Sequence, residues 1–152
     1  LLHMLLHRDL TDFNVRDVPQ TNALASQKLK SLDPLETWWH DCLDEGSIGF
    51  CDDEGRLLGF HRTFMGKSDA GCWPRFAATQ ALYDAYTAHS KSMGRRYPLP
   101  SSEFGKQFSR LAKVSRTRPN VHGSRVTGYD LPSLSGARQE FCKFLGHELV
   151  WE

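Results

Sequence analysis

The chain has 152 residues, of which 39% are hydrophobic and 24% are charged, and its formal net charge is +1 at pH 7. This length suits one domain with a core, or a small domain with an arm, and the composition excludes a disordered protein. No apolar run approaches the roughly 20 residues that cross a bilayer, so we expect no membrane partner.

The first 30 residues are predicted to form an arm. Leucines near helical spacing predict the last turns of a helix over residues 1–10, and their interruption by histidines excludes a signal peptide. The chain begins without Met, so we interpret it as a segment of a longer polypeptide. Thr21 is predicted to cap a helix that runs to about Lys30. We therefore assign residues 1–30 to a helical arm or linker, and residues 31–152 to the main domain.

The first helix of the main domain has strong boundary signals. Asp33 is predicted as its N-cap, with Pro34 in the first turn, Glu36 placed to bond back to the cap, and Gly46 as the stop. One side of this helix is apolar and consists of Leu35, Trp38, Trp39, Cys42 and Leu43. Residues 47–73 carry glycines, an acidic turn and short apolar runs, which predict loops and one or two short strands.

An alanine-rich run over residues 74–93 predicts a second core helix, which Gly94 closes. Ser101 or Ser102 is predicted to cap a third helix that ends near Lys113. Residues 114–118 and 125–131 then predict a β-hairpin around a turn at residues 119–123. A last helix is predicted from a serine cap at position 133 or 135 to the stop at Gly146. The expected fold class is therefore α+β, mainly helical with a small hairpin, and the order of elements is that of a winged helix-turn-helix.

Positive charge is concentrated in the third helix and the hairpin, because residues 106–125 include six Lys and Arg and no Asp or Glu. At 100° per residue, the basic side chains of the helix lie opposite its apolar side, so one face packs and the other presents cations. A cationic surface on a nearly neutral protein attracts a polyanion, and we expect DNA, with double strands favoured over single strands. The candidate DNA-binding residues are Lys106, Gln107, Arg110 and Lys113 from the helix, Arg116, Arg118, His122 and Arg125 from the hairpin, and Arg95 and Arg96 from the segment before the helix.

Several segments resemble one family. They are the run LLHRDLTDFNVRDVP at residues 5–19, then Thr21, Leu24, Gln27-Lys28-Leu29 and Ser31-Leu32-Asp33-Pro34 before Trp38, and later Leu82-Tyr83-Asp84-Ala85-Tyr86 and Ser102-Glu103-Phe104-Gly105-Lys106. Together they resemble the C-terminal region of phage and plasmid primase-helicases, the poxvirus-type members of helicase superfamily 3. In that family this region comprises the end of the ATPase module and a winged-helix domain. The resemblance covers both ends of the main domain but not residues 47–73.

The resemblance implies a DNA-replication protein of a phage, a plasmid or another mobile element, inside a bacterial or phage-infected cell. It implies DNA binding near an origin or fork, with an upstream ATPase domain of the same polypeptide as a second partner. The chain contains no GxxxxGK[ST] phosphate loop, so we expect no cofactor and no catalysis by this region itself. The helicase and primase activities would reside upstream.

The sequence also allows other interpretations. A winged helix can also dock a replication partner or a neighbouring subunit, and the basic helix face can be a solvated surface. Arg95 and Arg96 can equally satisfy the end of the preceding helix. The helical spacing of the aromatic residues favours a core over a platform for single-stranded DNA. We expect no metal site, because the cysteines are widely spaced and the acidic clusters at residues 41–45 and 52–54 lie at a helix end and in a turn.

Overall fold

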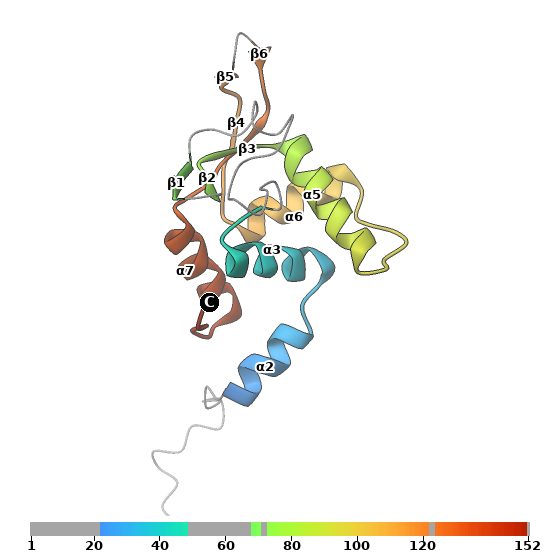
Figure 1. Cartoon of the computed structure of the whole chain (residues 1–152), viewed down its shortest axis with the longest axis vertical. Coiled ribbons are helices and arrows are strands. Elements are labelled where there is room, and N and C mark those ends of the chain that lie inside the picture. Colours follow the sequence, from blue (N-terminus) through green and yellow to red (C-terminus); the bar gives the residue numbers. More distant parts are fainter. Residues whose placement is uncertain (1–21, 49–67, 71–72, 122–123, 152) are drawn as a thin grey trace, which may run out of the picture.

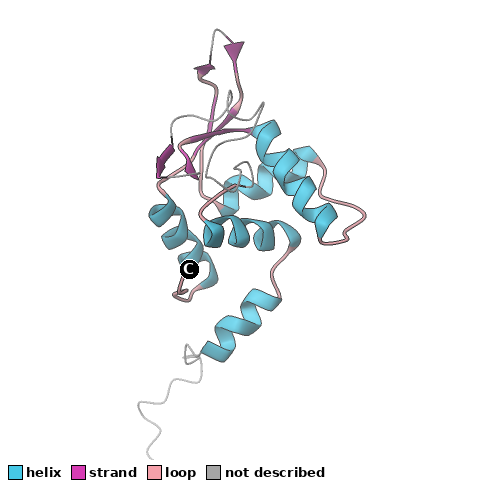
Figure 2. Ribbon diagram, in the orientation of Figure 1, coloured by secondary structure: helices cyan, strands magenta, loops and turns pink. Residues whose placement is uncertain are grey.

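The computed structural model describes residues 22–48, 68–70, 73–121 and 124–151 (Figure 1). Within these residues there are five helices and seven short strands (Figure 2). The helices are α2 (Asn22–Lys30), α3 (Pro34–Glu45), α5 (Thr79–Ser92), α6 (Ser101–Leu111) and α7 (Leu134–Leu145). The strands are β1 (Ser68–Ala70), β2 (Trp73–Pro74), β3 (Phe76–Ala78), β4 (Arg116–Thr117), β5 (Asn120–Val121), β6 (Ser124–Arg125) and β7 (Gly128–Asp130). The α+β class is therefore confirmed. The predicted helix over residues 1–10 lies outside the described residues.

The predicted boundaries of α3 are confirmed. Pro34 is the first helical residue, and the Glu36 carboxylate accepts a hydrogen bond from the backbone N–H of Asp33 at 2.8 Å. Gly46 ends the helix with φ 65°, a left-handed conformation that glycine adopts without a steric penalty. At the start of α7, Ser133 accepts a hydrogen bond from the backbone N–H of Gly136 at 3.2 Å, and Gly146 ends that helix as predicted.

Two helix starts differ from the prediction. Residues 76–78 form β3 rather than the first turn of α5, because they pair antiparallel with β7, and this pairing outweighs the helix propensity of their alanines. At α6 the N-cap is Pro100, so Ser101 is already helical and neither predicted serine caps the helix.

Helix α3 forms the centre of the core, where it packs against α5, α6 and α7 (Figure 1). The ring of Trp38 lies 5.8 Å from those of Tyr86 on α5 and Phe104 on α6, centroid to centroid. Trp39 meets Phe108 edge to face at 5.0 Å. These rings are almost fully buried, so the predicted role of the aromatic residues in the core is confirmed.

The main sheet has the strand order β3-β7-β4, with both pairs antiparallel. Strand β3 precedes α5, and β7 closes the hairpin that follows α6, so this sheet joins two segments about 50 residues apart in the sequence. The Tyr129 hydroxyl on β7 donates a hydrogen bond to the Gly105 carbonyl on α6 at 3.2 Å. The sheet therefore fixes the base of the hairpin against α6.

The sole described part of the arm is α2, whose observed range agrees with the predicted helix ending at Lys30. The Lys28 Nζ donates a hydrogen bond to the Leu145 carbonyl at the end of α7, at 2.7 Å. Helix α2 therefore contacts the main domain at the C-terminal end of α7 (Figure 1). None of the described helices combines the length and apolar character needed to cross a membrane.

Candidate nucleic-acid interface

The two faces of α6 differ as the sequence predicts. Phe104, Phe108 and Leu111 are buried in the core, whereas Lys106 and Arg110 are exposed. Gln107 is exposed as well. The helix therefore presents a polar, cationic surface to solvent while its other side anchors it to α3 and α5.

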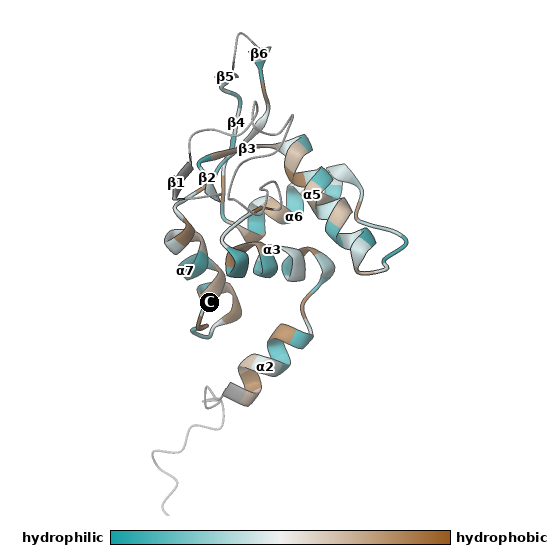
Figure 3. Ribbon diagram, viewed as in Figure 1, coloured by the Kyte–Doolittle hydropathy of each residue, from teal (hydrophilic) through white to brown (hydrophobic). Residues whose placement is uncertain are grey.

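The segment after α6 is a two-part hairpin, which we call the basic hairpin (residues 116–130). Strand β4 pairs with β7 at its base, and β5 pairs with β6 nearer its tip. The exposed Arg116, Arg118 and Arg125 give it positive charge, and β4 and β6 are hydrophilic in Figure 3. The prediction of a turn at residues 119–123 is wrong for Asn120 and Val121, which belong to β5. His122 lies outside the described residues.

A groove of about 990 Å³, which we call the basic groove, lies between α6, the basic hairpin and the first two turns of α5. The backbone N–H of Thr79, at the start of α5, donates a hydrogen bond to the Thr127 carbonyl in the hairpin at 3.0 Å, which holds the two elements together. The lining combines three cations and several polar side chains with apolar and aromatic ones. The cations are Lys106, Arg116 and Arg125, the polar side chains include Thr79, Gln80, Ser101, Ser102, Ser109, Ser124 and Thr127, and the apolar and aromatic side chains are Ala78, Ala81, Tyr83, Val126 and Tyr129. Cations thus reach the groove from two separate elements.

Few carboxylates offset this charge. Asp84 lines the groove and accepts a hydrogen bond from Gln80 Nε2 at 2.9 Å, and Glu103 forms an exposed ion pair with Lys106 at 3.2 Å. An exposed pair of this kind contributes little to stability, so Lys106 can exchange Glu103 for another anion at small cost. Four arginines have no ion pair within the described part of the chain, namely Arg110, Arg116, Arg118 and Arg125.

Lys113 differs from the other predicted contact residues. It follows α6 with φ 50°, and its Nζ lies 3.1 Å from Glu140 Oε2 on α7. Glu140 also accepts a hydrogen bond from Lys143 at 2.6 Å. Lys113 therefore ties the end of α6 to α7, and a DNA contact by Lys113 would compete with this pair.

The Glu140 pair predicts a pH dependence of stability. Hydrogen bonds from Lys143 and then Lys113 lower the pKa of the Glu140 carboxyl in the folded protein. A carboxyl with a lowered folded pKa stabilises the fold above its unfolded pKa of about 4.3, and this stabilisation is lost as the pH falls through the folded value. We expect Glu140→Gln to unfold at a lower urea concentration than wild type at about pH 7, and this difference to be smaller at about pH 3. A difference of equal size at both pH values would contradict this role.

Arg95 and Arg96 are exposed and follow the C-terminal end of α5. The groove is lined by the opposite end of α5, from Thr79 to Asp84. The backbone N–H of Arg95 donates a hydrogen bond to the Ser90 carbonyl at 2.9 Å, which helps to close the helix. The structure therefore does not bring these two arginines into the groove with Lys106, Arg116 and Arg125.

Some residues that line the basic groove were not among the predicted contact residues. Ser102, Lys106 and Ser109 lie one turn apart on α6, so helical spacing alone could have placed Ser102 beside the basic face. No sequence pattern predicts that Thr79 and Gln80 line the groove, because only the contact between α5 and the hairpin brings them there.

The described residues contain no candidate metal site. No group of three or more His, Cys, Asp or Glu among them could hold a metal ion. The Cys42 thiol is buried in the core, and this burial, followed by the charges of Glu45 and Asp41, raises its pKa well above the ordinary value. His61, Cys51 and the acidic turn at residues 52–54 lie outside the described residues.

No protein-family model, curated protein or solved structure matches this chain.

Proposed function

We propose that residues 31–152 form a winged-helix domain that binds double-stranded DNA through α6 and the basic hairpin. The order α3, β3, α5, α6 and hairpin supports this proposal, as does the pairing of β3 with the last strand of the hairpin. In a winged helix the third helix enters the major groove, and the hairpin, or wing, contacts the backbone or the minor groove. Here both elements carry exposed cations, Lys106 and Arg110 on α6 and Arg116, Arg118 and Arg125 in the hairpin.

The observation that carries the proposal is the convergence of cations on one groove. Lys106 comes from α6, whereas Arg116 and Arg125 come from two strands of the hairpin. A solvated helix face needs no such convergence, because its charges serve only to keep that helix in water. Cations and hydroxyls that line one groove suit the phosphate oxygens of a nucleic-acid backbone.

The proposed setting is a phage- or plasmid-type primase-helicase in which this domain holds DNA near an origin or fork. The motifs of residues 5–34 and 82–106 support this assignment through their resemblance to the C-terminal region of that family. An upstream domain of the same polypeptide would then hydrolyse ATP, and the winged helix would bind DNA without catalysis.

Fluorescence anisotropy with labelled duplex and single-stranded DNA of equal length tests the function. We expect the duplex to bind more tightly, and log Kd to rise with log salt by about 0.9 per phosphate contact. About three to five contacts from the groove and its neighbouring arginines predict a slope of roughly 2.7 to 4.5. No binding of either DNA at low salt would overturn the proposal.

A further inference from the structure

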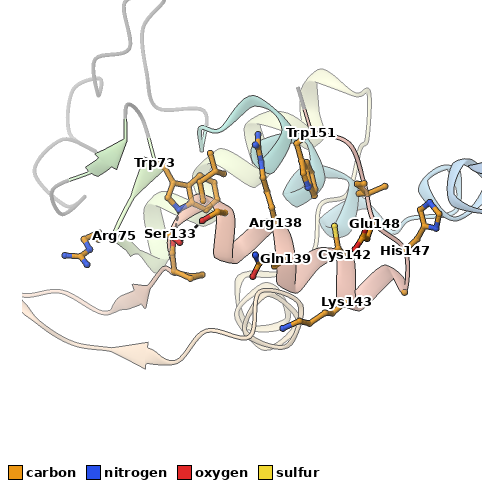
Figure 4. Close-up of a pocket in the computed structure, with 15 residues that line it drawn as sticks. Trp73, Arg75, Ser133, Arg138, Gln139, Cys142, Lys143, His147, Glu148 and Trp151 are labelled. Carbon is orange, nitrogen blue, oxygen red and sulfur yellow. Dashed lines mark hydrogen bonds between the residues drawn. The ribbon is translucent and has the colours of Figure 1, made fainter.

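A second groove lies along the outer face of α7, and we call it the α7 groove. It has a volume of about 1230 Å³ and runs between Trp73 and Arg75, the exposed side of α7, and the C-terminal residues 146–151 (Figure 4). The opposite side of α7, with Ala137, Phe141 and Leu145, is buried in the core. The α7 groove and the groove beside α6 share no lining residue, so both can be occupied at the same time.

The walls of the α7 groove are held in place without a ligand. Trp73 is 3% exposed, and its indole N–H donates a hydrogen bond to the Pro132 carbonyl at 2.9 Å. Arg138 donates hydrogen bonds to the Leu43 and Asp44 carbonyls at 2.8 and 3.0 Å, and its guanidinium lies 5.2 Å from the ring centroid of Trp151. Figure 4 shows Arg138 between the two tryptophans. A pre-formed groove of this kind costs little ordering entropy when it is filled.

The lining of the α7 groove combines apolar side chains with a positive balance of charge. Its apolar part consists of Trp73, Pro132, Leu134, Cys142, Leu149 and Trp151. Among the described residues, its charged part has three cations, Arg75, Arg138 and Lys143, and the carboxylate of Glu148, while Glu140 beside the groove pairs with Lys143 at 2.6 Å, so a positive balance remains. An occupant that matches both properties carries large apolar side chains next to acidic ones.

Two observations favour a peptide over other anions. Base stacking needs an open ring face, whereas Trp73 is almost completely buried and Arg138 lies over Trp151. The volume also exceeds the roughly 300 to 1,000 Å³ that is usual for small-molecule pockets. We propose that the α7 groove binds an acidic peptide segment of a partner protein, anchored by an aromatic or large aliphatic side chain.

The reactivity of the Cys142 thiol can show whether a peptide occupies the α7 groove, because Cys142 lines this groove and forms no disulfide. The probe is a synthetic octapeptide with four aspartates and two phenylalanines, and the readout is the rate of Cys142 alkylation by iodoacetamide, measured by mass spectrometry. We expect alkylation to slow about tenfold at a peptide concentration of about nine times Kd. The buried Cys42 should stay unmodified, which verifies that the protein remains folded.

Matched peptides and variants make the test specific. Lysines in place of the aspartates, or serines in place of the phenylalanines, should abolish protection. Arg75→Gln with Lys143→Gln should weaken it about tenfold, whereas Lys91→Gln with Arg95→Gln, two exposed cations away from this groove, should not. No protection at about 1 mM acidic peptide, or equal protection by the lysine peptide, overturns the proposal.

Duplex DNA separates this proposal from the proposed function. We expect DNA to leave the alkylation rate of Cys142 unchanged, because the α7 groove shares no residue with the basic groove. Protection of Cys142 by DNA would assign this surface to nucleic acid and overturn the peptide proposal. Failure of DNA to bind at all would overturn only the proposed function.

Discussion

Reversing the charge of Arg110 and Arg116 together should lower the affinity for duplex DNA on the order of 100-fold at moderate salt. Arg110 belongs to the exposed face of α6, and Arg116 lines the groove from the first strand of the basic hairpin. Neither forms an ion pair among the described residues, so the substitutions break no observed link within the fold. The slope of log Kd against log salt should fall by about 2, because each lost phosphate contact removes about 0.9.

The double variant Arg95→Glu with Arg96→Glu is the matched control for this experiment. It changes the net charge by the same amount, but at the C-terminal end of α5, away from the end that lines the groove. We expect its affinity to fall far less, and its salt slope to stay near the wild-type value. Equal losses in the two double variants would show that net charge alone, rather than the groove, attracts DNA.

Gly128→Ala should destabilise the fold by about 3 kcal/mol or more, because it inserts a methyl group where β7 lies against β3. A Cβ atom on Gly128 would lie 2.3 Å from the Ala77 carbonyl oxygen and 2.5 Å from Phe76 Cζ. The Ala77 oxygen is a backbone atom of β3, and Ala77 is fully buried, so this atom cannot move aside without opening the sheet. The free energy of unfolding, measured in urea by tryptophan fluorescence, gives the loss directly.

Gly94→Ala is the control for this substitution. A Cβ atom there would meet no atom within 4 Å, but Gly94 has φ 72°, so alanine incurs only backbone strain of about 1 kcal/mol. The difference between the two variants isolates the steric clash at the sheet. A loss at Gly128 no larger than that at Gly94 would show that β3 and β7 separate easily. In that case the base of the basic hairpin would not be held as the structure indicates.

The basic groove and the α7 groove correspond to two alternative functions that the sequence allows, DNA binding and the docking of a partner protein. A winged helix that binds DNA and one that docks a partner were alternatives because either fits the same pattern of elements. The structure places the basic groove between α6 and the hairpin, and the α7 groove on the outer face of α7. Because the two grooves share no residue, the two roles can coexist, and the charge-reversal and alkylation experiments test them separately.

Features that depend on neighbours within one or two helical turns could be predicted from the sequence alone. Asp33, Pro34 and Glu36 predicted the start of α3, and Gly46 predicted its end, because capping involves residues only a few positions apart. The opposition of Phe104 and Lys106 on α6 followed in the same way from 100° per residue. These local rules also located the concentration of positive charge.

Which of these elements pair or pack against each other depends on the tertiary structure. Phe76–Ala78 form a strand because Gly128–Asp130, about 50 residues later, offer hydrogen-bond partners that no local pattern records. The same long-range packing brings Thr79 to the basic groove and ties Lys113 to Glu140. Trp73 likewise reaches the start of α7 only through the tertiary fold, because its indole N–H bonds to the carbonyl of Pro132, 59 residues later. Periodicity predicts the faces of single elements, whereas a groove depends on the packing between elements, and packing is a property of the whole chain.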